Sequence, residues 1–344
     1  MSDWYDLVEN DRSGVVYSRV RLARNWDEYA FPHKLTDKES REVVVRLEQG
    51  LSGLGSVDGH SYEAAFLSQL RDLDREALRE RRVLNVSAAA KRSPVGLMIS
   101  DDESVSLVFN GDDHIRLQVL SPGLTLRQSY DRADRIDDYI NERVPYAFDD
   151  KYGYLTTFPT NMGTGLKASA VVHLPSLCTS RKFGELLGEM SRFGITVRGV
   201  YGQGGDNYGA LYEVYNQKTL GQSEQEIIDL VEKVARQLTA QELQVRDKTL
   251  ENHRLSAEDQ AYKSYGVLKY ARRLTMKDAM TFLSQIMTGM ADGLIRPETP
   301  CPVYRLMLGI QPANLQKSAP RPLGKDELDG ARAEYLRRAL PELV

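Results

Sequence analysis

Short apolar runs separated by polar turns fill much of residues 1–220. Three of them, 95–99, 105–109 and 115–120, are each about a strand long, and acidic turns at 100–104 and 110–114 join them. Connections this short predict antiparallel pairing, because a parallel crossover needs a dozen or more residues. Further strand-like runs lie at 167–174, 195–201 and 210–215, and the last two flank a glycine-rich loop at 202–209.

Helical periodicity marks other segments. Residues 126–144 and 183–190 place apolar residues on one face, and leucines among charges predict a solvated helix over 65–82. Ser223 and Glu226 form a capping box followed by apolar residues at helical spacing. From there to about residue 295 the chain is compatible with helix, with a second start signal at Thr275–Asp278, and a last helix is expected over 325–340.

These patterns predict an α+β fold in two parts. At roughly 150 residues per domain, 344 residues favour about two domains. We expect an antiparallel sheet flanked by helices in residues 1–240 and a helical C-terminal domain in residues 241–344, with the change of character falling between 222 and 245.

Charge and composition narrow the function classes. Lys and Arg total 45 against 49 Asp and Glu, a net charge of −4, which does not favour nucleic acid or anionic lipid as a partner. No apolar run approaches the ~20 residues of a membrane helix, and the polar, acidic start at 1–6 predicts no signal peptide. Two cysteines make neither a disulfide framework nor a thiolate-only zinc site. We expect a cytoplasmic protein.

Arginines in strand-like segments are the most informative candidates for chemistry. The chain has no G-x-x-x-x-G-K-[ST], G-x-G-x-x-G, H-E-x-x-H or G-x-S-x-G pattern. Arg19 and Arg21 alternate and so share one face of an extended segment, Arg116 lies within an apolar strand, and Arg198 precedes the glycine loop. Converging guanidinium groups would clamp phosphate, whereas the alternative is a solvent-facing sheet edge.

A family resemblance supports the phosphate interpretation. The segments SRVRLARN (18–25), NGDDHIR (110–116), YLTTFPTNMGTGLKAS (154–169) and 198–216 resemble the motifs of the ATP:guanido phosphotransferases. Residues 216–224 and 264–268 resemble its bacterial branch, the protein-arginine kinases. The resemblance spans almost the whole chain and implies the catalytic fold of guanido kinases. Like that branch, the chain is expected to lack the N-terminal helical domain of creatine and arginine kinases.

The resemblance assigns the two sides of an active site. It implies that Arg19, Arg21, Arg116 and Arg198 bind the ATP phosphates, that Lys167 takes the place of a fifth arginine, and that Mg²⁺ arrives with the nucleotide rather than in a protein cage.

On the guanidinium side four positions depart from the family. Asp112 stands at the position of a catalytic glutamate, Gly111 replaces the glutamate before it, and Gln203 replaces the glutamate of the loop. Phe158 replaces a reactive cysteine. The phosphate side therefore keeps its positive charge, while the guanidinium side has lost carboxylates and the thiol of the family pattern.

Other residues near these motifs have structural alternatives. Cys178 is expected to be a small buried hydrophobe, His114 is open to a structural or a catalytic role, and Asp113 is expected to bond to the arginine clamp. Asp329 and Arg332 resemble part of a phosphoarginine-binding R-D-x-x-R-A motif, with Leu328 in place of its first arginine. The alternative for this pair is helix-surface charges at i, i+3 spacing.

The implied function is ATP-dependent phosphorylation of arginine residues in proteins, linked to stress response and Clp-protease targeting. The implied partners are substrate proteins with exposed arginines, a second copy of the chain through residues 245–295, a zinc-binding activator protein and the Clp system. Two alternatives remain: a pseudokinase that binds nucleotide or phosphoarginine proteins as a scaffold, and a kinase for a small free guanidino compound.

Overall fold

An antiparallel sheet organises the N-terminal two thirds of the described chain. The computed structural model describes residues 2–181, 183–202 and 207–344. Within these residues the main sheet has eight strands, all paired antiparallel as predicted. Their order across the sheet is β2 (Tyr62–Phe66), β3 (Gly96–Ser100), β4 (Val105–Phe109), β5 (Ile115–Pro122), β1 (Val15–Arg24), β8 (Leu166–His173), β10 (Leu211–Asn216) and β9 (Ile195–Gly199). A small hairpin joins β6 (Phe148–Asp149) to β7 (Gly153–Tyr154).

Helices cover one face of this sheet almost completely. They are α1 (Asp37–Gly50), α5 (Leu126–Asn141), α6 (Phe183–Arg192) and the first part of α7 (Glu224–Tyr270). Val20 and Leu22 of β1 point into the core beneath them, together with Leu117 of β5 and Ala168 of β8. Because side chains alternate along a strand, the neighbouring residues Arg19 and Arg21 face the opposite side.

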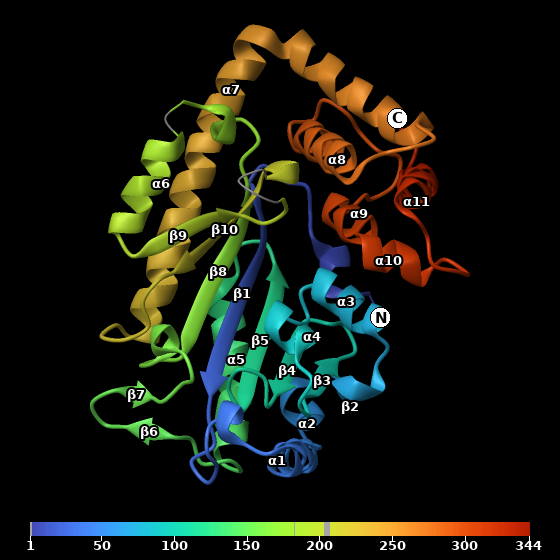
Figure 1. Cartoon of the computed structure of the whole chain (residues 1–344). Helices are drawn as coiled ribbons and strands as arrows, with labels where there is room; N and C mark the ends of the chain where they lie inside the picture. Colours follow the sequence, from blue (N-terminus) through green and yellow to red (C-terminus); the bar gives the residue numbers. More distant parts are fainter. Residues whose placement is uncertain (1, 182, 203–206) are drawn as a thin grey trace.

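The opposite face is covered only in part. Over β3 and β4 lie α3 (Asp72–Glu80) and α4 (Val86–Ala90), around a small core that includes Leu84, Leu97 and Val108. One end of the sheet packs against the C-terminal helices, and the short helix η1 (Trp4–Leu7) near the start of the chain joins the same core (Figure 1). The C-terminal helices are the second part of α7, α8 (Met276–Ala291), α9 (Val303–Gly309), α10 (Pro312–Lys317) and α11 (Lys325–Ala339).

Helix α7 passes through the predicted domain boundary. Its N-terminus is the predicted capping box, in which Ser223 accepts from the Glu226 amide and Glu226 accepts from the Ser223 amide. The backbone of His253 leaves helical geometry (φ −141°, ψ 34°), and the helix turns over the top of the sheet there (Figure 1). The second start signal is confirmed as well, because Thr275 caps α8 by accepting from the Asp278 amide.

The solvated helix predicted for 65–82 is wrong over its first half. Residues 62–66 form edge strand β2, a 3-10 turn η3 (Leu67–Gln69) follows, and helix begins only at Asp72. Leu67 is 1% exposed, in the small core with Leu84 and Leu97. Burial of this leucine against the sheet outweighs the helical propensity of the charges around it.

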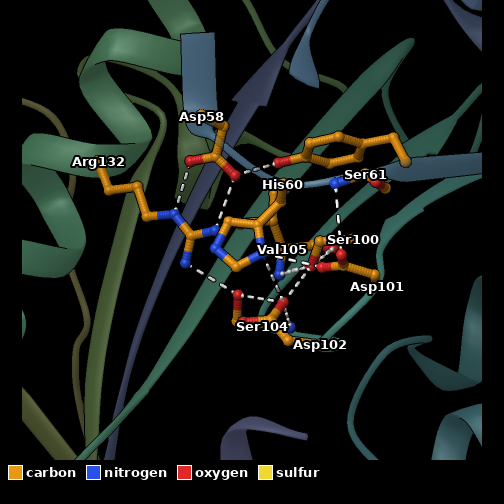
Figure 2. A network of polar contacts seen from close by, with 10 residues as sticks. Asp58, His60, Ser61, Ser100, Asp101, Asp102, Ser104, Val105 and Arg132 are labelled. Carbon is orange, nitrogen blue, oxygen red and sulfur yellow. Dashed lines mark hydrogen bonds and ion pairs between the residues drawn. The ribbon is translucent and has the colours of Figure 1, made fainter. Parts of the chain in front are cut away.

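A network of polar contacts connects α5 to α2 (Gly55–Asp58) and to the turn between β3 and β4 (Figure 2). Arg132 of α5 donates to Asp58 at the end of α2 through two nitrogens at 2.7 Å, and to Ser104 Oγ at 2.8 Å. His60 lies 2.9 Å from Asp101 in the same network. Together these contacts anchor the β3–β4 turn.

None of the described helices carries an apolar stretch of the length that a bilayer crossing requires.

Candidate active site

Strand register gathers the predicted cations on the partly open face. Arg21 of β1 lies opposite Lys167 of β8, and Arg19 lies opposite Ser169. Arg116 of β5 pairs with Ala23 of β1, which lies two residues after Arg21 on the same face of the strand. The odd-numbered positions of β1 and β8 and the even-numbered positions of β5 share this face, because their alternates fill the core on the other side.

Three of these cations line a common cavity. Arg21, Arg116 and Lys167 border a space of about 140 Å³ together with Asp112 and Asn161. The sequence prediction placed these cations on the phosphate side and Asp112 on the guanidinium side, and the cavity brings the two groups together.

Arg19 and Arg198 are held by one buried carboxylate. Glu213 of β10 pairs through Oε1 with Arg19, while its Oε2 accepts from Arg198 Nη2 at 2.9 Å and Nε at 3.2 Å. Arg19 Nε also donates to Ser169 Oγ at 3.3 Å. Glu213 therefore fixes two guanidinium groups at the edge of the cluster, a role that the sequence patterns did not reveal.

Burial and mutual repulsion destabilise the charged forms of these groups. The pKa of Arg21 lies well below its usual value because the group is buried and because Arg19, Arg116 and Arg198 repel it. Burial and Arg19 lower the pKa of Arg116 to about 10, and burial and Arg21 lower the pKa of Lys167 to about 8. A bound polyanion would relieve this repulsion.

Arg21 also keeps an unused donor. Its Nε is buried and has no hydrogen-bond partner among the described residues. A buried donor without a partner carries a desolvation penalty. A phosphate oxygen at this point would remove that penalty and form a charge-assisted hydrogen bond.

Asp112 lies in the turn between β4 and β5 and lines the cavity. Its Oδ1 accepts from Ser87 Oγ at 2.6 Å and its Oδ2 accepts from Asn85 Nδ2 at 3.2 Å. Both donors belong to α4 and its N-cap. The carboxylate is thus held by neutral donors rather than by an arginine.

The neighbours of Asp112 have structural partners. Asp113 is buried and accepts from Asn25 Nδ2 and the Thr157 amide, both at 2.7 Å, rather than from the arginines as expected. His114 Nδ1 accepts from the Trp26 amide at 3.0 Å, and burial lowers the pKa of this histidine to about 4. His114 is therefore neutral at physiological pH and fixes the start of β5.

The remaining predicted residues of the guanidinium side are only partly described. Phe158 is 48% exposed and follows Thr157, whose hydroxyl donates to the Asp112 carbonyl at 2.8 Å. Gln203 lies outside the described residues. Cys178 is half-buried beside the core, and burial raises the pKa of its thiol, which does not favour a reactive thiolate.

Sequence reasoning missed Arg82. This residue ends the charged run predicted as solvated helix, yet its Nε and Nη2 are buried without hydrogen-bond partners among the described residues. Its guanidinium lies 4.7 Å from the centre of the Tyr201 ring and lowers the pKa of Arg19. Arg82 adopts a left-handed backbone (φ 72°), so the helix stops and the side chain turns under the sheet face. No local pattern distinguishes it from its exposed neighbours.

Asp329 and Arg332 are not surface charges. Arg332 is 3% exposed and donates to Asp329 at 2.6 Å and to the carbonyls of Leu274 at 2.8 Å and Ile310 at 3.2 Å. These bonds join α11 to the segments before α8 and after α9. The alternative of helix-surface charges is therefore wrong, because the pair lies inside the C-terminal core.

A group of side chains that could hold a metal ion lies away from this cavity. Among the described residues, His60, Asp101 and Asp102 bring one ligand atom each within 4.8 Å of one another. They adjoin the β3–β4 turn, at the opposite end of β4 from the turn that carries Asp112. Their atoms already bond to one another and to Ser61, Ser100 and Ser104.

Solved structures define the class of the fold. The duplicated taurocyamine kinase of Schistosoma mansoni with bound transition-state analogue components matches with a TM-score of 0.61 at 24% identity, over 72% of this chain and 36% of that chain. Lombricine kinase matches with a TM-score of 0.59 at 23% identity, over 73% of this chain and 71% of that chain. The chain therefore has the fold of the guanido kinases, as predicted.

Sequence comparison places the chain more narrowly. The pattern of the ATP:guanido phosphotransferase C-terminal catalytic domain matches residues 46–245, and that of the protein-arginine kinase McsB C-terminal domain matches 254–343. The chain belongs to the ATP:guanido phosphotransferase family. It is 37% identical over 330 residues to the protein-arginine kinase of Caldanaerobacter subterraneus subsp. tengcongensis (96% of this chain, 98% of the relative). It is 36% identical over 340 residues to that of Halothermothrix orenii (99% and 97%).

Proposed function

We propose that this protein transfers the γ-phosphate of ATP to arginine side chains of other proteins. The observation that carries the proposal is the convergence of Arg21, Arg116 and Lys167 on one cavity that Asp112 also lines. The second carboxylate of the lining, Asp113, is engaged by Asn25 and Thr157. The cations match a nucleotide polyphosphate and the Asp112 carboxylate matches an incoming guanidinium.

The proposed reaction follows from this arrangement of cations and carboxylate. A terminal nitrogen of the substrate arginine attacks the γ-phosphorus, and an N–P bond forms as the bond to the β,γ-bridging oxygen breaks. ADP leaves with that oxygen, and the nitrogen gives up a proton. Asp112 orients the guanidinium, whose pKa above 12 makes alignment essential, and accepts the proton. Arg21, Arg116 and Lys167 stabilise the charge on the phosphoryl oxygens. ATP is proposed to enter as its Mg²⁺ complex.

A protein substrate suits the surroundings of Asp112 better than a free amino acid. Val86 on α4 is 68% exposed, and Phe158 is 48% exposed next to the same turn. Exposed apolar side chains beside a catalytic group offer a contact surface to a polypeptide. The curated relatives named protein-arginine kinase favour the same substrate class.

Further features of the proposal rest on the family resemblance. We infer a cytoplasmic homodimer through the C-terminal domain (residues 241–344), assisted by a zinc-binding activator protein and acting in stress response and Clp-protease targeting. The second part of α7 supports the dimer, because Leu255, Tyr262 and Tyr270 are exposed there by 79%, 46% and 72%. Binding of phosphoarginine by Asp329 and Arg332 would require their buried pair to open.

The second candidate is a pseudokinase that binds nucleotide as a scaffold. It is favoured by the guanidinium side, where Asp112 is shorter than glutamate, Gln203 carries no charge and Phe158 carries no thiol. Restoring Gln203→Glu together with Phe158→Cys should raise transfer if the chain is a weakened enzyme. A pseudokinase would gain nothing from the same change.

The deciding experiment is transfer of labelled γ-phosphate from ATP to an arginine-rich protein substrate. The proposal predicts label that is lost in acid and kept in base, as expected for an N-phosphoryl bond, and no label with an arginine-free protein. MgADP binding without any transfer, even by the restored double variant, would establish the pseudokinase instead.

A further inference from the structure

Three polar side chains at the ends of the short helix α4 contact the turn that carries Asp112. Ser87 and Asn85 donate to the two oxygens of the Asp112 carboxylate, at 2.6 Å and 3.2 Å. At the other end of the helix, Lys91 Nζ donates to the carbonyls of Asn110 at 2.8 Å and Gly111 at 2.7 Å. The side chain and the backbone of the turn are therefore both bound to one element.

Asn85 caps helix α4 and also donates a hydrogen bond to the Asp112 carboxylate. Its Oδ1 accepts from the Ala88 amide at 3.1 Å and caps α4, while its Nδ2 faces Asp112. Ala88 is buried in the small core over β3 and β4. The position of Asp112 is thus linked through a helix cap to the packing of α4 on the sheet.

The rest of the turn is fixed from the opposite side. Thr157 donates through its hydroxyl to the Asp112 carbonyl at 2.8 Å and through its amide to Asp113 at 2.7 Å. With the backbone held on both sides, the direction of the Asp112 side chain depends on the two donors of α4. Asn85 itself lines the cavity with Arg21, Arg116 and Lys167.

We propose that Ser87 and Asn85 are positioning residues for phosphoryl transfer, which aim the Asp112 carboxylate at the substrate guanidinium. The inference rests on the proposed function of the same site. A carboxylate has about four lone-pair positions, so two neutral donors leave positions free for a guanidinium edge. Because both donors are neutral, neither replaces the substrate guanidinium as the ion-pair partner of the carboxylate.

This arrangement explains how a short side chain serves at this position. An aspartate reaches one methylene less far than a glutamate, so its carboxylate follows the backbone of the turn more closely. Side chains that align reacting groups affect the rate of the chemical step more than the binding of substrate. Loss of either donor should therefore lower kcat with little change in KM.

The test compares four variants in the γ-phosphate transfer assay. Ser87→Ala removes one donor, and Ser87→Thr keeps the hydroxyl. Asn85→Ser retains a good helix cap but removes the amide that faces Asp112. Ala90→Ser, on the exposed end of the same helix, is the matched control. Each variant is measured for kcat, for KM of the protein substrate, for the Kd of MgADP and for thermal unfolding.

We expect Ser87→Ala and Asn85→Ser each to lower kcat about tenfold, as for a lost hydrogen bond to a charged group. KM, the Kd of MgADP and the unfolding temperature should stay near wild type, and Ser87→Thr should recover most of the rate. An active wild type whose Ser87→Ala and Asn85→Ser variants keep full kcat would overturn this inference alone. A fall in kcat that follows the unfolding temperature or the Kd of MgADP would overturn it too, because it would indicate a structural role. A wild type without transfer activity would overturn the proposed function and the inference together.

Discussion

The sheet face and the C-terminal core each hold a buried arginine, and the two arginines differ in how their donors are used. On the sheet face, Arg21 lies among Arg19, Arg116 and Arg198, and its Nε has no partner among the described residues. In the C-terminal core, Arg332 bonds to Asp329 and to two carbonyls. An arginine that leaves no buried donor without a partner, as Arg332 does, stabilises the fold, whereas one with an unpartnered buried donor among like charges, as Arg21 has, is prepared for an anion.

The largest effect should come from the satisfied arginine. Arg332→Ala leaves Asp329 as a buried charge without its main partner, and we expect a loss of about 3–5 kcal/mol in the free energy of unfolding. Urea denaturation measures this loss, and the Kd of MgADP in the folded fraction should not change. The double variant Asp329→Leu with Arg332→Met should recover much of the stability, since it removes both charges together. A stable Arg332→Ala protein with weakened nucleotide binding would reverse the distinction between the two environments.

A second effect concerns the carboxylate that faces the cations. Asp112→Asn preserves shape and removes the anionic partner of the incoming guanidinium, so transfer should fall 10²-fold or more. MgADP should bind as well as before or better, because a negative charge beside the phosphates is gone. Steady-state transfer kinetics and calorimetry test the two parts separately. Unchanged transfer in Asp112→Asn would remove this residue from the mechanism.

A smaller effect should appear in the pH dependence of nucleotide binding. The pKa of Lys167 is about 8 in the free protein because of burial and Arg21, and a bound polyphosphate raises it. Lys167 is charged below that pKa, so MgADP affinity should be constant there and fall by up to about tenfold per pH unit above it. Calorimetry between pH 7 and 9.5 measures the slope. Lys167→Arg should flatten it, and an equal slope in both proteins would assign the titration elsewhere.

Much of this arrangement was predictable from the sequence, and the exceptions have physical reasons. Alternation along residues 18–25 indicates that Arg19 and Arg21 share a face, whereas the pairing of β1 with β8, which brings Lys167 opposite Arg21, is seen only in the structure. The short acidic turns at 100–104 and 110–114 predicted the β3–β4–β5 order correctly. The shared face of Arg19 and Arg21 and the order of β3, β4 and β5 depend on local spacing, which the sequence displays directly.

Residues that depend on packing between distant segments were not predictable. Arg82 and Asp72 belong to one charged run, yet only Arg82 is turned beneath the sheet face by its left-handed backbone. Asp329 and Arg332 have the spacing of surface charges on a helix, but α11 packs them against α8 and α9. The contacts of Ser87 with Asp112 join residues 25 positions apart, and no motif connects them.

The most direct test of this account is the Arg21→Met variant, measured for MgADP affinity and for the free energy of unfolding of the nucleotide-free protein. Methionine keeps much of the packing and removes a repelled charge and an unpartnered donor. We predict that affinity falls by about tenfold or more, as for a lost charge-assisted hydrogen bond, while the free energy of unfolding stays constant or rises. Unchanged affinity together with a loss of several kcal/mol in stability would show that Arg21 is a structural residue like Arg332, and would contradict the assignment of this face to the phosphates.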